Sequence, residues 1–79
     1  MVIYLKAGGN LRVSLKPDID YYTRRVVTEE GKSIREILTD IDINPALIAF
    51  VYTDGKVKGL HYIPSDGQTL TLQPPVAGG

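Results

Sequence analysis

The residues whose types and spacing could support chemistry stand at the carboxyl end, where Gln73 is followed by Pro74-Pro75-Val76-Ala77-Gly78-Gly79. Two consecutive prolines fix φ at about −65° and lack backbone donors, so a strand cannot continue its hydrogen bonding through them. The last four residues would span roughly 13 to 14 Å when extended. We therefore expect residues 74–79 to form an extended, flexible tail on a domain of residues 1–73.

Gly78 and Gly79 are the predicted reactive end of this tail. Because neither has a Cβ, a narrow channel of another protein could close around the backbone, and a nucleophile would meet no side chain beside Gly79. A carboxylate is a poor acyl donor, so it would first need activation, most simply as a mixed anhydride with AMP formed by an ATP-using partner. Sulfide, a thiol or an amine could then displace AMP. The competing interpretation is a frayed chain end without a role.

Composition excludes several other kinds of chemistry. The 79 residues include no cysteine and one histidine, which removes disulfides, thiolate nucleophiles and zinc-thiolate sites, and we expect no bound metal or cofactor. Sulfur carried covalently would therefore sit on the terminal acyl carbon as a thiocarboxylate. Nine basic and nine acidic residues cancel, so we expect no nucleic-acid partner. No segment reads as a signal peptide or a membrane span, which predicts a cytoplasmic protein without a membrane partner.

One helix is predicted in the middle of the chain. Ser33 and Glu36 have the spacing of a capping box, in which each side chain accepts a hydrogen bond from the other residue's backbone N–H. Apolar residues at positions 34, 37, 38 and 41 predict one buried stripe. The pair Asn44-Pro45 favours an extended conformation. We expect a helix from Ser33 to Ile41 that packs by one side only.

Short apolar segments on both sides of this helix predict the strands of an α+β domain. They are residues 1–7, 21–28 (an edge strand), 48–53, 56–58 and 69–72. Asp54-Gly55 supplies a tight hairpin turn. We expect the first and last strands to pair in the middle of the sheet, because that arrangement buries the most apolar surface. Gly8-Gly9-Asn10 is interpreted as a turn, and residues 11–15 fit either a strand or one helical turn.

Strand alternation also predicts a sheet face that a single helix cannot cover. Phe50, Tyr52 and Tyr62 are the aromatic residues expected nearest the tail, and part of this cluster, or of the polar residues 69, 71 and 73, must lie on the open face. We expect this face to dock partners, the alternative being an ordinary solvated face. The predicted partner-binding residues are Phe50, Tyr52, Thr71, Gln73, Pro74, Pro75, Val76 and Ala77.

The chain resembles a known family in its opening strand, the helix at residues 33–41, the segment 51–55, the Asp66-Gly67 turn and above all the closing block 74–79. These features are similar to the sulfur-carrier family that includes ThiS and MoaD, relatives of ubiquitin. The proline pair is closer to MoaD, the small subunit of molybdopterin synthase, whereas residues 11–25 do not follow the family pattern. The resemblance implies a β-grasp fold, with a mixed four- to five-stranded sheet and one main helix on one face.

The resemblance also implies a function. Gly79 would be adenylated by an E1-like enzyme, converted to a thiocarboxylate, and used to donate sulfur in cofactor biosynthesis of the molybdopterin or thiamine type. The implied partners are that ATP-using enzyme, a sulfurtransferase or cysteine desulfurase, and an acceptor synthase such as the large subunit of molybdopterin synthase or thiazole synthase. The chain would be a carrier, not an enzyme. Two rival hypotheses are a ubiquitin-like modifier conjugated to lysine amines through Gly79 and a non-covalent β-grasp adaptor.

The remaining polar residues have simpler interpretations. His61 has no orienting partner in the sequence, so we interpret it as a surface histidine. The aspartate pairs at 18 and 20 and at 40 and 42 lack the spacing of a calcium loop, and we interpret them as turn and helix-end acids.

Overall fold

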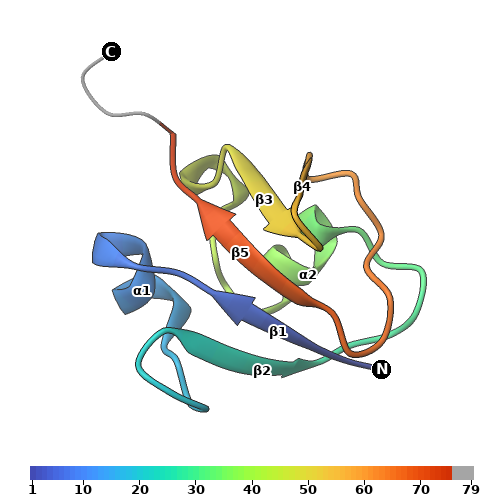
Figure 1. Ribbon diagram of the computed structural model, residues 1–79, viewed down its shortest axis with the longest axis horizontal. Coiled ribbons are helices and arrows are strands. Elements are labelled where there is room, and N and C mark those ends of the chain that lie inside the picture. The colour runs from blue at the N-terminus through green and yellow to red at the C-terminus, as the bar shows by residue number, and fades with distance from the viewer. Residues whose placement is uncertain (76–79) are drawn as a thin grey trace.

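A computed structural model describes residues 1–75, which form one sheet with helices packed against one of its faces (Figure 1). This architecture confirms the predicted α+β class. In chain order the elements are β1 (Val2–Lys6), α1 (Gly9–Leu15), β2 (Thr23–Val27), α2 (Ile34–Asp40), the 3₁₀ helix η1 (Pro45–Leu47), β3 (Phe50–Thr53), β4 (Lys56–Lys58) and β5 (Thr69–Gln73).

The sheet has five strands in the order β2-β1-β5-β3-β4. The first and last strands pair in parallel at its centre, as predicted, and the other three pairings are antiparallel. β2 is an edge strand, also as predicted. At the other edge, Asp54 and Gly55 both adopt positive φ angles, 53° and 74°, which suit the predicted tight turn between β3 and β4.

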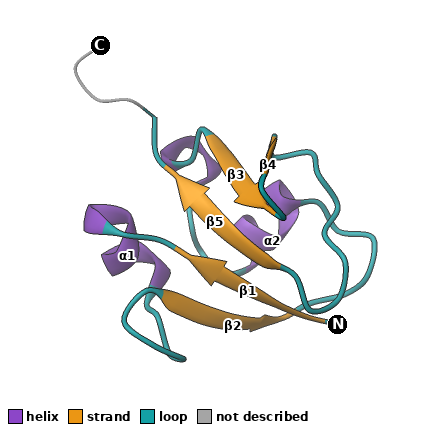
Figure 2. Ribbon diagram, in the orientation of Figure 1, coloured by secondary structure: helices purple, strands orange, loops and turns teal. Residues whose placement is uncertain are grey.

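The apolar core lies between one face of the sheet and α2. Alternate residues of the central strands point into it, and the apolar stripe of α2 covers them. In Figure 2, α2 lies behind β3 and β5, so the viewer faces the uncovered side of the sheet. The core residues of the central strands and α2 are Ile3, Leu5, Val51, Leu70, Leu72, Ile34, Ile37 and Leu38, all at most 2% exposed.

The predicted capping box at the start of α2 is present. The backbone N–H of Glu36 donates to Ser33 Oγ at 3.2 Å, and the backbone N–H of Ser33 donates to Glu36 Oε1 at 3.1 Å. The hydrogen bond from the Ser33 backbone lowers the pKa of Glu36 below its ordinary value of 4.5. The helix begins at Ile34 and ends at Asp40, with Ile41 as its C-cap, within one residue of the prediction.

Replacing Ser33 by alanine is expected to destabilise the domain by about 1 kcal/mol, because the Glu36 backbone N–H loses its acceptor. A folded-state pKa below the unfolded value means that Glu36 contributes stability above pH 4.5 and that this contribution is lost as the pH falls through the lowered pKa. The Ser33 side chain, after the Ser33 backbone, also helps to lower this pKa, and alanine removes that interaction. Urea titrations at neutral pH and near pH 3 should therefore show a smaller Ser33→Ala penalty in acid. Thr39→Ala, an exposed change on the same helix, is the control, and an equal effect there would contradict the capping assignment.

The segment before β2 corrects one prediction and resolves another. Gly8-Gly9-Asn10 was interpreted as a turn, and this is wrong, because Gly9 opens the seven-residue helix α1. Residues 11–15, which fitted either strand or helix, belong to this helix. Leu11 and Leu15, four residues apart, are both buried on one side, whereas Val13 between them is 67% exposed. The alternation of leucine and valine resembled a strand, and no side chain caps the short helix to mark its start.

Within residues 1–75, no helix is long and apolar enough to cross a bilayer.

Candidate functional site

The root of the tail lies where β5 ends. The backbone N–H of Ala49 donates to the carbonyl of Gln73 at 2.8 Å, and the exposed residues Pro74 and Pro75 follow without backbone donors of their own. The strand therefore stops at Gln73, as the proline pair predicts. The other predicted tail residues, Val76, Ala77, Gly78 and Gly79, lie outside the described residues.

The register between β3 and β5 brings four of the predicted partner-binding residues together. Phe50 pairs with Gln73 and Tyr52 pairs with Thr71, so all four side chains share the face of the sheet opposite α2. The rings of Phe50 and Tyr52 meet edge to face with centroids 5.4 Å apart, and Tyr52 is 42% exposed. This group is an aromatic and polar surface beside the root of the tail, and we call it the open-face cluster.

Two further residues extend this cluster and were missed by sequence reasoning. Val57 of β4 pairs with Tyr52 and is 57% exposed, while Lys6 of β1 pairs with Thr71 and is also exposed. Both belong to the same face only because of the strand register, which alternation within a single strand does not reveal. The third aromatic residue of the predicted cluster, Tyr62, packs against the core instead, and its hydroxyl donates to Gln68 Oε1 at 3.0 Å.

A groove lies on the other side of the tail root, between α1 and η1. Its volume is about 410 Å³. Leu47 on one wall is 44% exposed, and Leu11 on the other is buried. The groove, which we call the root groove, is lined by Asn10, Leu11, Ser14, Ala46, Leu47, Pro74 and Pro75. Sequence reasoning anticipated only the two prolines as partner-binding residues, because the other walls depend on α1, which the sequence left unassigned.

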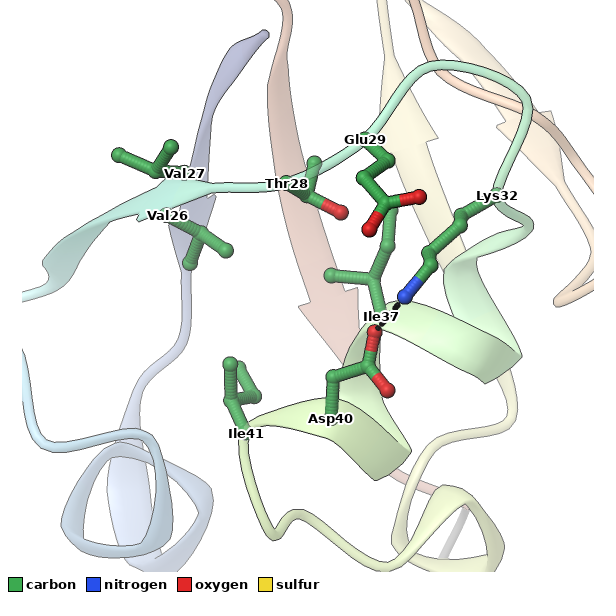
Figure 3. A pocket seen from close by; sticks show the side chains of 8 residues that line it. All are labelled: Val26, Val27, Thr28, Glu29, Lys32, Ile37, Asp40 and Ile41. Carbon is green, nitrogen blue, oxygen red and sulfur yellow. Dashed lines mark hydrogen bonds and ion pairs between the residues drawn. The ribbon is translucent and has the colours of Figure 1, made fainter.

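A second hollow, of about 270 Å³, lies between β2 and α2, away from the tail root (Figure 3). Val26, Ile37 and Ile41 form its apolar part, and the side chain of Lys32 reaches across its rim to Asp40 at 2.5 Å. The hydrogen bond to the Asp40 carboxylate raises the pKa of Lys32 above its ordinary value of 10.5. Such an exposed ion pair contributes little to stability, and the hollow shares no residue with the tail root.

The aspartates at 18 and 20 hold the loop before β2, as interpreted from the sequence. Asp18 Oδ1 accepts a hydrogen bond from the backbone of Arg25 at 2.8 Å, and Asp20 Oδ1 accepts one from the backbone of Tyr22 at 2.9 Å. The bond from Tyr22 lowers the pKa of Asp20. His61 is exposed, in agreement with its interpretation as a surface histidine. The aspartates act as structural turn residues.

The sheet order, the central parallel pair and the position of α2 define a small β-grasp domain, which confirms the predicted fold. The crystal structure of SAMP1 from Haloferax volcanii is similar to it over 100% of both chains, with a TM-score of 0.68 and 22% sequence identity. At that identity the likeness concerns the fold. No protein-family model matches the chain, and no curated protein matches it in sequence.

Proposed function

We propose that this protein is a sulfur carrier whose Gly79 carboxylate is activated by an E1-like adenylating enzyme and converted to a thiocarboxylate. The observation that carries the proposal is the position of the tail root. β5 ends at Gln73, which belongs to the open-face cluster, and the next two residues, Pro74 and Pro75, line the root groove. A partner that handles Gly78 and Gly79 thus finds two surfaces for docking within a few residues of the reactive position.

The proposed chemistry takes place at the Gly79 carbonyl carbon. A carboxylate oxygen attacks the α-phosphorus of ATP, which releases pyrophosphate and leaves an acyl-adenylate. Hydrosulfide then displaces AMP. A sulfurtransferase or cysteine desulfurase can supply the same sulfur as a persulfide, provided that a thiol reduces the acyl disulfide formed. Donation of the sulfur to an acceptor, followed by hydrolysis of the Gly79 acyl group, restores the carboxylate. The carrier is therefore regenerated at the end of the cycle and catalyses none of its steps.

The likeness to SAMP1 supports this assignment at the level of the fold, because a ubiquitin-like β-grasp domain is the fold expected of such a carrier. The proline pair at the tail root favours an acceptor of the molybdopterin type over the thiamine type. For the molybdopterin type, the acceptor would be the large subunit of molybdopterin synthase. For the thiamine type, it would be thiazole synthase. We place the protein and these partners in the cytoplasm. ATP is a substrate of the adenylating enzyme and not a cofactor of this protein.

The test is the intact mass of the protein after incubation with its E1-like enzyme, ATP and a sulfide source. We expect one oxygen to be replaced by sulfur, and tandem mass spectrometry should place that sulfur on Gly79. Unchanged mass with a fully active enzyme would contradict the proposal. If the chain instead became linked to lysine amines of cellular proteins without forming a thiocarboxylate, it would be a protein modifier and the sulfur-carrier assignment would be wrong.

A further inference from the structure

The root groove has the character of a binding site for an uncharged group. None of the described residues that line it carries a charge. Leucine, alanine and proline side chains make up most of its surface, and Asn10 and Ser14 add polar atoms at one wall. The volume of the groove, about 410 Å³, is at the lower end of the range found for small-molecule sites. A groove of this size can hold a large aliphatic or aromatic side chain.

The groove is also close to the reactive position in chain length. Pro75 lines it, and Gly79 is four residues further on, so the Gly79 carbonyl carbon lies within roughly 14 Å of the groove in any conformation. An enzyme that places Gly79 against ATP therefore brings its own surface to within about 14 Å of the groove, a distance at which the two surfaces can meet.

We propose that the root groove receives an apolar side chain of the adenylating enzyme, in addition to any contact that the enzyme makes with the open-face cluster. This inference rests on the proposed function and identifies a specific docking contact for it. The exposed wall residue Leu47 then becomes buried in the complex, which releases water from an apolar surface. The contact contributes binding and takes no part in the bond-forming steps.

Leu47→Glu tests the contact with little risk to folding, because Leu47 is 44% exposed and is not a core residue. Leu47→Met conserves volume and apolarity and serves as the conservative variant. Ile63→Glu is the matched charge control, since Ile63 is 53% exposed and lies in the segment before β5, at the opposite end of that strand from Pro74. Thermal unfolding should be similar for all four proteins.

The measurement is ATP–pyrophosphate exchange by the E1-like enzyme at varied carrier concentration. Leu47→Glu should raise the KM for the carrier roughly tenfold or more, because the complex would bury an unpaired carboxylate. A loss of docking alone leaves kcat at saturation nearly unchanged. Leu47→Met and Ile63→Glu should behave like the wild type. A KM for Leu47→Glu within twofold of the wild-type value would overturn the inference.

Failure of the two proposals can be told apart. If the wild type supports no exchange, the proposed function fails; if the wild type is active and Leu47→Glu matches it, only the groove contact fails. A second measurement follows the Leu11 and Leu47 methyl signals by NMR as the enzyme is added to a chain lacking Gly78 and Gly79. We expect both to shift. Concentration-dependent shifts without enzyme, together with a dimer in sedimentation, would assign the groove to a second copy and refute its assignment to the enzyme.

Discussion

Deletion of Gly78 and Gly79 should abolish adenylation while leaving the melting temperature unchanged. The deletion places the new terminal carboxylate two residues, or roughly 7 Å, short of the position at which the enzyme holds ATP. Because displacing a reacting group by even 1 Å costs about a hundredfold in rate, exchange should fall by at least that factor. The fold should not respond, since the core residues within the described part of the chain all lie between positions 3 and 72.

A chain extended by two residues beyond Gly79 is the control for this deletion. It keeps every residue of the carrier but presents a different carboxylate, so it should also be inactive until a protease trims it back to Gly79. Restored exchange after trimming would show that the position of the carboxylate, and not the overall length, matters. Full biological activity of the deleted chain would instead identify a non-covalent adaptor and contradict the proposed chemistry.

The parts of the fold that the sequence predicted well are those specified by neighbouring residues. Ser33 and Glu36 are three residues apart and satisfy each other's backbone donors, so the start of α2 could be placed without knowing the rest of the fold. Asp54-Gly55 likewise determines its turn through positive φ angles that few other pairs tolerate. The stop of β5 at Gln73 follows from the chemistry of the next two residues.

The parts that were missed depend on residues far apart in the chain. Helix α1 has seven residues and no side-chain cap, so its helical state comes from the burial of Leu11 and Leu15 and not from local signals. The root groove needs that helix together with η1 and Pro75, three segments separated by tens of residues. Val57 and Lys6 joined the open-face cluster through strand register for the same reason.

The strongest destabilisation is expected from Leu5→Ala. Leu5 is fully buried on β1, in the central parallel pair, where it lies opposite Leu70. Removing its side chain leaves a cavity and should cost about 2 to 5 kcal/mol. A domain of this length has a total stability of roughly 4 to 12 kcal/mol, so the variant would lose a large part of it. Urea unfolding should show a midpoint lower by at least about 1 M.

Leu47→Ala provides the matched comparison, because it makes the same chemical change at a leucine that is 44% exposed and outside the core. Its stability should fall by less than about 1 kcal/mol, since little apolar surface is returned to water. Its exchange kinetics should nevertheless show a raised KM, whereas Leu5→Ala, assayed at a temperature where it remains folded, should keep the wild-type KM. One leucine would then be required by the fold and the other by the partner. A destabilisation of equal size in both variants would mean that Leu47 supports the domain itself, and the groove would lose its role in docking.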